Sequence, residues 1–515
     1  MYKTTHIETL SKMQKVILSL LFCAFILIGL RIAGDYGVAW DDHLQTAIGK
    51  QNLEYALGQN TAIFHNVDRF YGSAFEVPLY FVQHFFSSYK SQIYVRHILT
   101  YFYFLLGLYV FFRLLMRLFH SFPLALLGMF LLYLNPRIFA HSFFNTKDIP
   151  FLTSFIISLY TLWRFLESPA KTKKLILHAF VSAFIIDIRS IGFLVPILSI
   201  TMFMLVYIPS RKFNKMLKPL AKYILIMAVF VYALWPAMWT HPLLVMESFF
   251  RMAHFPWRYT NLIAGHLVLA TQNPWYYIPL WIGITTPVII VAFYLLGVFF
   301  IVWDFTKIKY LTKNSSWLFI SFLSLFPLGL WLVFLIVKPT FYDGWRQLFF
   351  LAPLMILGAV YAVKRVFKFL INRKYALSLA ILIVLLVTLL PVINIILLHP
   401  YQQTHFNLLI SKNKNVIRNN YEMDYWGLSY KEGFERLLKL DKSAHINVYV
   451  GNIAAIDNWK LTDESFHRIH LVDKLKDADY LITNYRFHPK EFPYKKVISI
   501  ERQGSCILGV YQLKK

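Results

Sequence analysis

Two adjacent acids, Asp41 and Asp42, follow the first apolar run of the chain, in the sequence Trp40-Asp-Asp-His43. Neighbouring carboxylates next to an apolar run are costly to desolvate, which makes them candidates for chemistry. A carboxylate with a raised pKa acts as a general base when a hydroxyl lies within hydrogen-bond reach. The alternative is a solvated acidic turn, or an aspartate that caps a helix beginning near His43. Taken alone, the dipeptide favours this structural interpretation.

Basic residues beside an acid occur between two later apolar runs. This stretch begins with Asn-Pro-Arg137 and ends with Asn-Thr-Lys147-Asp148-Ile-Pro. Arg137 and Lys147 are candidates for gripping a phosphate, and Asp148 for orienting one of them or contacting a sugar. The alternative is a turn at the membrane interface, with snorkelling bases and a helix started by proline.

Two other charged groups adjoin apolar runs. Asp187 and Arg189 suggest an ion pair at the ends of two spans, with either a structural or a functional role. Tyr342, Asp343 and Arg346 stand before a late apolar run. The planar fork of an arginine binds phosphate oxygens, so Arg346 is a candidate anchor for a lipid-linked phosphate. An aromatic-belt turn that contains a charge pair is the alternative.

An aromatic and polar segment, His399–Asn407 with Tyr421–Gly427 downstream, leaves the last apolar run. It suits a hinge between domains or a platform for carbohydrate. The chain has no Gly-rich phosphate loop, no CxxC motif and no serine-centred nucleophile elbow, and no His/Asp cluster has metal spacing. We therefore expect no metal site and no cofactor, although the available acids leave a divalent cation open.

Apolar runs supply the elements that must position these residues. Of the 515 residues, 58% are hydrophobic and 15% are charged, whereas soluble domains carry about 25% charged residues. The runs are near the length of a bilayer span, about 17–25 residues. They predict an all-α bundle of about eleven helices, near 14–33, 93–112, 122–134, 150–166, 175–187, 192–209, 220–236, 278–303, 316–337, 347–363 and 376–398. We interpret the first run as a retained span, because no clear cleavage site follows it.

The distribution of charge orients the expected bundle. With a cytoplasmic N-terminus, the inner segments hold 22 of the 34 Lys and Arg residues before His399, as the positive-inside rule requires. These segments are 1–15, 113–117, 164–174, 211–222, 307–313 and 364–374. Ten of the 13 acids before His399 fall on the other side. The net charge of +26 would suggest nucleic acid for a soluble protein, but this distribution indicates a bilayer and no nucleic acid.

The composition changes at His399, which divides the chain into a membrane domain, 1–398, and a C-terminal domain, 399–515. The C-terminal part contains strand-like segments at 445–450, 478–484, 497–500 and 506–513 and a helical segment over 432–440. An odd number of spans places this small α/β domain outside the cytoplasm. Outer loops 35–91 and 237–277 are long enough to fold on the membrane surface, and 241–259 suits an interfacial helix.

In their order and placement, these blocks resemble the GT-C glycosyltransferases. Among them, they are most similar to bacterial relatives of the protein O-mannosyltransferases (glycosyltransferase family 39) and of the aminoarabinose lipid A transferases. The resemblance covers about residues 10–400. It rests on the acidic pair, the Lys147-Asp-Ile-Pro block and the Tyr342-Asp-Gly-Trp-Arg346 block. The segment after the last span also looks like its counterpart in bacterial members.

The resemblance implies a sugar donor linked to polyprenyl phosphate, an extracytoplasmic acceptor and inversion at the anomeric carbon. Asp41 would be the base, and Asp42 stands where the family usually has glutamate. Lys147, Arg189 and Arg346 would stabilise the departing lipid phosphate. Loop 237–277 is too short for the sugar-binding domain of eukaryotic protein mannosyltransferases, so a protein acceptor is not specifically implied. The expected location is the inner membrane.

Three other functions stay open at this point. A flippase or transporter of lipid-linked glycans should show symmetric halves or broken helices near the midplane, which the sequence does not indicate. A polysaccharide polymerase or ligase would have large arginine-rich outer loops. A membrane scaffold that displays the C-terminal domain would leave the ten outer acids without a role.

Overall fold

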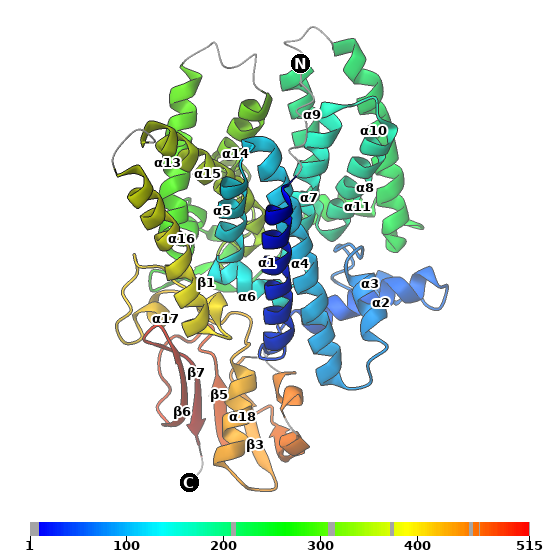
Figure 1. Cartoon of the computed structure of the whole chain (residues 1–515). Helices are drawn as coiled ribbons and strands as arrows, with labels where there is room; N and C mark the ends of the chain where they lie inside the picture. The colour runs from blue at the N-terminus through cyan, green and yellow to red at the C-terminus, as the bar shows by residue number, and fades with distance from the viewer. Residues whose placement is uncertain are drawn as a thin grey trace.

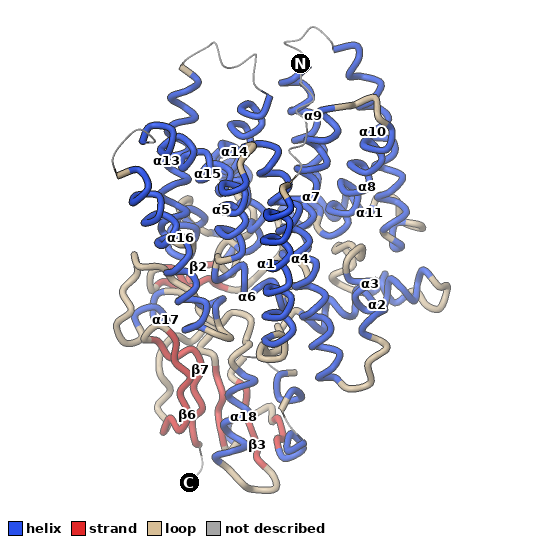
Figure 2. Tube along the Cα trace, in the orientation of Figure 1, coloured by secondary structure: helices blue, strands red, loops and turns tan. Residues whose placement is uncertain are grey.

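The computed structural model describes residues 10–207, 213–306, 315–370, 375–452, 457–462 and 464–513. Apolar helices form a bundle, and a smaller region with β-strands adjoins one end of it (Figures 1 and 2). The strands of the larger sheet all follow the last long helix in the sequence. The bundle and this C-terminal region therefore come from consecutive stretches of the chain.

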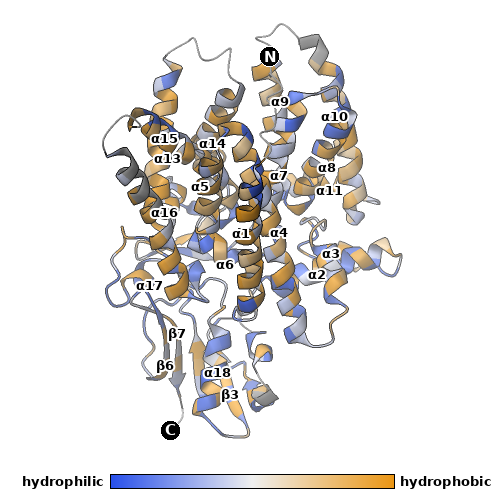
Figure 3. Ribbon diagram, viewed as in Figure 1, coloured by the Kyte–Doolittle hydropathy of each residue, from blue (hydrophilic) through white to orange (hydrophobic). Residues whose placement is uncertain are grey.

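Long apolar helices account for the bundle. Eight segments of the described chain are long and apolar enough to cross a membrane: Lys12–Ile32 (α1), Tyr89–Phe119 (α4), Asp148–Glu167 (α7), Ser190–Tyr207 (η2 and α9), Met216–Leu234 (within α10, Phe213–Leu234), Val288–Phe305 (α13), Ser315–Val337 (α14) and Arg346–Leu370 (η6 and α15). Phe122–Tyr133 (α5) and Pro136–Phe144 (α6), bent by 66°, add a ninth if they count as one span. Figure 3 shows how strongly hydrophobic residues dominate these helices. The chain is a multi-pass membrane protein.

Each of the eleven expected apolar runs coincides with helical structure. The two helices beyond the nine spans are α8 (Thr172–Ile188), which has 17 residues, and α16 (Ala376–Leu398). The run expected over 278–303 is divided into α12 (Tyr277–Thr285) and α13. Pro287 causes the break, because proline disfavours a helical conformation in the residue before it. The predicted helical membrane bundle is confirmed.

The outer loops contain short elements of their own. Residues 35–91 form α2 (Asp42–Ala56) and α3 (Glu76–Gln83), and residues 237–277 form α11 (Leu244–Ala253) and the hairpin β1 (Thr260–Ile263) and β2 (His266–Leu269). The helix expected within 241–259 is α11. Its Ser248 hydroxyl donates to the Phe70 carbonyl at 2.6 Å, while Phe250 is exposed. This helix thus ties the two outer loops together.

The C-terminal region is built on a five-stranded sheet with the order β4–β3–β5–β7–β6. Strand β3 pairs in parallel with β4 and β5, whereas β7 pairs antiparallel with β5 and β6. The predicted strands correspond to β3 (Ile446–Val450), β5 (Tyr480–Thr483), β6 (Lys495–Arg502) and β7 (Ser505–Gln512), and the predicted helix is α18 (Tyr430–Leu440). Strand β4 (Ile469–Leu471), which is only three residues long, was not expected.

The stretch after α1 ties the bundle to the C-terminal region. The Tyr36 hydroxyl donates to Gln402 at 3.0 Å, and the Asn458 side chain forms hydrogen bonds with the backbone N–H and C=O of Val38, at 2.8 and 2.9 Å. Helix α1 runs toward the sheet and ends beside it (Figure 1). The side of the membrane that each end faces in the cell stays a prediction, and much of the expected inner basic sequence (1–9, 208–212, 307–314 and 371–374) lies outside the described residues.

Candidate active site

Asp41 meets Lys147, although 106 residues separate them in the sequence. Asp41 occupies the N-cap position of α2, but its side chain makes no capping hydrogen bond. Instead, its Oδ2 lies 3.3 Å from the Lys147 Nζ, which also sits 4.4 Å from the centre of the Tyr71 ring. The capping alternative for Asp41 therefore does not describe its side chain, whose carboxylate faces a buried ammonium group.

The Asn145 side chain sets the position of Lys147 and Asp148. Its Oδ1 accepts hydrogen bonds from the backbone N–H groups of Lys147 and Asp148, at 3.2 and 2.8 Å. This turn starts α7, with Asp148 as its first residue. Side chains of this type favour such local bonds at helix starts. The turn thus fixes the backbone from which both predicted side chains project.

Asp148 is the hub of a buried charge network. Its side chain is only 1% exposed and forms ion pairs with Arg189 and, at 2.7 Å, with the Nη1 of Arg346. Asn145 donates a further hydrogen bond to it at 2.9 Å. A buried carboxylate needs such partners, because removing one partner of a buried ion pair typically destabilises a protein by about 3–5 kcal/mol. We had expected Asp148 to orient Arg137 or Lys147. Its side chain instead orients Arg189 and Arg346.

Arg346 connects this hub to the turn that precedes its own helix. Its Nε lies 2.8 Å from Asp343 Oδ2. Asp343 and Gly344 both have positive φ, +56° and +65°, and the Gly344 N–H donates to the Tyr277 hydroxyl at 3.0 Å. Burial raises the pKa of Asp343 to about 6, against the lowering effect of Arg346 and Arg137. The turn therefore holds a carboxyl group that takes up a proton more readily than an ordinary aspartate.

Aromatic rings surround the Arg346 guanidinium. Its Cζ lies 4.6 Å from the Trp426 ring, 5.1 Å from the Tyr342 ring and 5.3 Å from the Tyr425 ring. Tyr342 also stacks on Trp257, with ring centres 4.5 Å apart. Such cation–π contacts hold a guanidinium without neutralising it. Part of the aromatic segment after the last span, at Tyr425 and Trp426, therefore joins the predicted site residues.

Neither Arg137 nor Asp187 forms an ion pair with a member of this network among the described residues. Arg137 donates from Nε to the His405 carbonyl at 2.9 Å and packs between the rings of Trp281 and Phe406. The predicted ion pair between Asp187 and Arg189 is wrong, because Asp187 instead accepts the Ser73 N–H at 3.0 Å. Helix α8 ends at Ile188 and Arg189 is extended, so the two side chains diverge.

Asp42 is held by a residue that sequence reasoning missed. The fully buried Arg96 of α4 places its Nε 2.9 Å from Asp42 and its Nη2 3.0 Å from Glu76. The same Nη2 lies 3.5 Å from the Thr146 hydroxyl. Asp42 follows Asp41 and Thr146 precedes Lys147, so one guanidinium contacts both neighbours of the Asp41–Lys147 pair. Arg96 thus fixes the two segments relative to each other.

If the Asp41–Lys147 pair is catalytic, Arg96→Lys should lower turnover about 100-fold, the cost typical of a misplacement of roughly 1 Å, while the KM for the substrates changes little. Lysine keeps the positive charge, but one ammonium group cannot reproduce the fork between Asp42, Glu76 and Thr146. Initial rates at several substrate concentrations separate the two parameters. Arg113→Lys, on the same helix, is the matched control and should behave as wild type. A change confined to KM would contradict the positioning role.

An apolar groove leads to the charge network. Its volume is about 240 Å³, and it lies between α9, α11, α14 and the segment after α14. Arg189 and Tyr71 line it, and Ile197, Val333 and Val337, which also line it, are largely exposed on helices that can span a membrane. Exposed apolar side chains on a membrane-spanning helix contact the hydrocarbon chains of the bilayer. The groove therefore runs from exposed apolar side chains on these helices to Arg189.

The described residues contain no group of three or more His, Cys, Asp or Glu side chains placed to hold a metal ion. The ion pairs of the network join Lys147, Arg189 and Arg346 to Asp41, Asp148 and Asp343. The charges of these three cations and three carboxylates balance one another. Protonation of Asp343 would give the network a net positive charge and favour the binding of an anionic ligand.

No family model matches this chain, and no curated protein is detected as a relative. Among solved structures, ArnT from Cupriavidus metallidurans in the apo state aligns with a TM-score of 0.47 and 13% identity, over 96% of this chain and 98% of that chain. ArnT from the same organism bound to undecaprenyl phosphate aligns with a TM-score of 0.45 and 14% identity, with the same coverage. A likeness at this level assigns no activity to the chain.

Proposed function

We propose that this protein is a GT-C-type glycosyltransferase of the inner membrane. It transfers a sugar from a polyprenyl-phosphate donor to an acceptor hydroxyl on the extracytoplasmic side, with inversion. The observation that carries the proposal is the junction at Arg189, where a lipid-facing apolar groove meets a buried network of cations. An amphipathic molecule with a long apolar chain and an anionic head fits both parts. A carboxylate, Asp41, pairs with Lys147 at the same site.

The proposed reaction is a single displacement at the anomeric carbon. Asp41 takes the proton of the acceptor hydroxyl while the acceptor oxygen forms the new glycosidic bond. The bond between the anomeric carbon and the phosphate oxygen breaks, and its electron pair stays on the phosphate. Lys147, Arg189 and Arg346 stabilise that charge as it develops. Attack from the face opposite the phosphate inverts the anomeric configuration.

Two observations support the proposed role of Arg346 in stabilising the phosphate. Its Nη2 is buried without a hydrogen-bond partner among the described residues, so a donor nitrogen is available for a phosphate oxygen. The raised pKa of Asp343 also lets this carboxyl group take up a proton when a second anion binds nearby. Charge-assisted contacts of this kind are stronger than neutral hydrogen bonds. Arg137, which packs on Trp281 and Phe406, is proposed to shape the site from outside the network.

The purified full-length protein should transfer a labelled sugar from a polyprenyl phosphate to a component of a cell-envelope extract. Mass spectrometry of the extract identifies the product by the added mass of one sugar. The matched control is the same donor without the phosphate, which should give no product. Failure of every lipid-phosphate sugar to serve as donor would contradict the proposal, and movement of intact donor across a vesicle membrane would instead indicate a flippase.

A further inference from the structure

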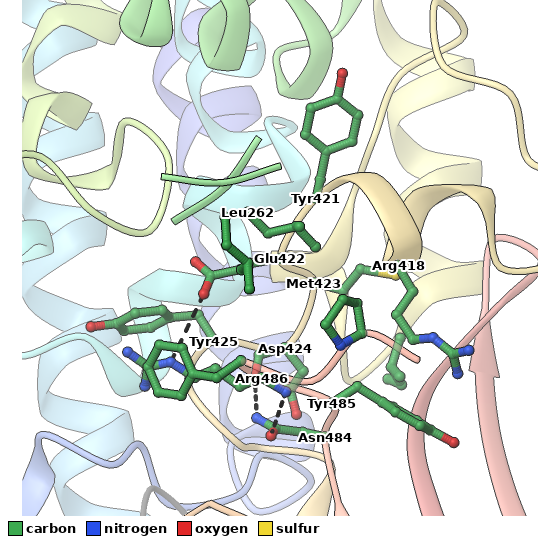
Figure 4. A pocket seen from close by; sticks show the side chains of 14 residues that line it. Leu262, Arg418, Tyr421, Glu422, Met423, Asp424, Tyr425, Asn484, Tyr485 and Arg486 are labelled. Carbon is green, nitrogen blue, oxygen red and sulfur yellow. Dashed lines mark hydrogen bonds and ion pairs between the residues drawn. The ribbon is translucent and has the colours of Figure 1, made fainter. Parts of the chain in front are cut away.

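The junction between the bundle and the C-terminal region contains openings of very different size. Residues 421–425 and 484–487 line a narrow crevice (Figure 4). Its volume is about 20 Å³, which leaves room for about one water molecule. A much larger groove, of about 530 Å³, lies between the end of α1, the start of α4 and the start of α18. Of these two openings, the larger one has room for an organic ligand.

This α1–α4 groove lies where two helices that can span a membrane reach the C-terminal region. Helix α1 ends at Ile32, and the residues that follow it, Ala33 and Gly34, line the groove. Tyr94, near the start of α4, also lines it, and its hydroxyl donates to the Leu30 carbonyl at 2.9 Å. The ends of spans lie at the boundary between the hydrocarbon core and the headgroups of a bilayer. The groove is therefore placed at the level of the lipid headgroups.

Most of the lining of the α1–α4 groove is apolar. Ile93 and Leu461 contribute to it, and so does the exposed side chain of Phe86. Helix α1, which ends at the groove, exposes Leu27 and Leu30. Exposed apolar side chains on a membrane-spanning helix contact acyl chains of the bilayer. The groove thus offers an apolar surface at a place that acyl chains can reach.

Two lysines bring positive charge to this apolar groove. Lys431, near the start of α18, lines it and donates from Nζ to the carbonyls of Gly34 and Asp35, at 2.6 and 3.3 Å. An ammonium group has three donors, so these bonds leave one donor of Lys431 for a ligand. Lys90, in the first turn of α4, is exposed and lines the same groove. The position of one ammonium group is therefore fixed by the backbone, and the other is free to approach a ligand.

The positive charge of the groove is not neutralised by a direct ion pair. No carboxylate of the described residues pairs with Lys90 or Lys431, and the nearby Asp35 pairs with His399 at 2.8 Å. Burial is the main effect on the pKa of Lys431, which it lowers. Lys90 lowers this pKa further, whereas Glu435 and Asp35 raise it. A phosphate group near both lysines would offset the repulsion between them.

We infer that the α1–α4 groove binds an anionic phospholipid, with its phosphate at Lys90 and Lys431 and an acyl chain against the apolar lining. The charge of the two lysines and the position of the groove at the ends of two spans favour a lipid over a water-soluble ligand. The groove shares no lining residue with the groove at Arg189, so the inference does not rest on the proposed glycosyl transfer. Lys90 belongs to the bundle and Lys431 to the C-terminal region, so the bound lipid would hold these two parts together.

Native mass spectrometry of the full-length protein in detergent tests this inference. Titration with phosphatidylglycerol and with phosphatidylcholine of the same acyl chains gives a dissociation constant for the first molecule of each lipid, and the wild type should bind phosphatidylglycerol more tightly. Lys90→Gln and Lys431→Gln should each weaken binding of phosphatidylglycerol about 10-fold, the loss expected for one charge-assisted contact. Binding of phosphatidylcholine should not change. Lys439→Gln, also on α18 but not in the lining of the groove, is the matched control and should bind both lipids as the wild type does.

A third variant keeps the test valid if loss of Lys431 loosens the contact with Gly34 and Asp35. The atom nearest to a Cβ at Gly34 would be Cδ2 of Tyr94, at 3.6 Å, which is an ordinary van der Waals distance. Gly34→Phe therefore fills the groove while both lysines stay in place, and it should weaken binding of phosphatidylglycerol as strongly as the loss of a lysine.

Three results would each overturn the inference: equal affinity of the wild type for the two lipids, wild-type affinity in both lysine variants, or wild-type affinity in folded Gly34→Phe protein. Glycerol 3-phosphate, which carries the phosphate without acyl chains, should not displace the lipid at equal concentration. Displacement as strong as that by phosphatidylglycerol itself would overturn the assignment to a lipid.

Discussion

Asp41→Asn should lower the rate of sugar transfer about 100- to 10,000-fold, the range typical for loss of a general base. Asparagine keeps the size and shape of the side chain but cannot accept the acceptor proton. The N-cap position is not at risk, because asparagine is a good N-cap residue and the Asp41 side chain makes no capping bond in any case. The effect should therefore fall on turnover rather than on folding.

Initial rates and binding of polyprenyl phosphate, measured on the same preparation, separate these possibilities. Binding of the lipid should stay close to wild type, because Arg189 and Arg346 keep their contacts with Asp148. Asp35→Asn is the matched control: Asp35 also follows α1, but it is half-exposed and pairs with His399. Transfer at the wild-type rate by Asp41→Asn would remove Asp41 from the mechanism.

Local sequence signals were sufficient to find most of the charge network. Asp41, Lys147, Asp148 and Arg346 each stand next to an apolar run, and the alternating direction of the expected spans places them on the same side of the membrane. Polar groups at span ends are conspicuous because the surrounding residues are uniformly apolar. Which charges pair across the bundle depends on helix packing, so the pairing of Asp148 with Arg189 and Arg346 could not be predicted.

Arg96 shows where a sequence signal is misleading. It stands inside an apolar run expected to span the membrane, where a single arginine is easily interpreted as a snorkelling side chain. Its partners, Asp42 and Glu76, come from the separate outer-loop helices α2 and α3. Two carboxylates and a guanidinium that are far apart in the sequence give no common motif. Only the folded outer loop brings them together.

Asp187 and Arg189 show the opposite error, because their spacing suggested a contact that the fold does not make. Residues two apart do not face each other along a helix, and here the helix ends between them, at Ile188. The backbone of Arg189 is extended, with φ −153° and ψ 136°. The two side chains therefore serve different partners, Ser73 for Asp187 and Asp148 for Arg189.

Arg189 is the cation for which a phosphate-binding role can be tested most directly. Of the three cations in the network, it is the one that lines the apolar groove. Its side chain is 16% exposed, whereas that of Arg346 is 2% exposed. Arg189→Gln should leave the rest of the network in place, because Asp148 keeps Arg346 and Asn145 as partners. A loss of lipid-phosphate binding in this variant would therefore reflect a lost contact with the ligand and not a disturbed fold.

We expect Arg189→Gln to weaken polyprenyl-phosphate binding about 10- to 100-fold, the loss expected for one charge-assisted contact. Binding of the uncharged polyprenol should not change, because the apolar groove is intact. The wild-type protein should thus prefer the phosphate to the alcohol, and the variant should lose most of that preference. The control variant Arg258→Gln removes an exposed cation from outer loop 237–277. It should keep the wild-type preference for the phosphate. An equal loss for both lipids would show that Arg189 shapes the groove instead, and the departing phosphate would then have to be stabilised by Lys147 and Arg346 alone.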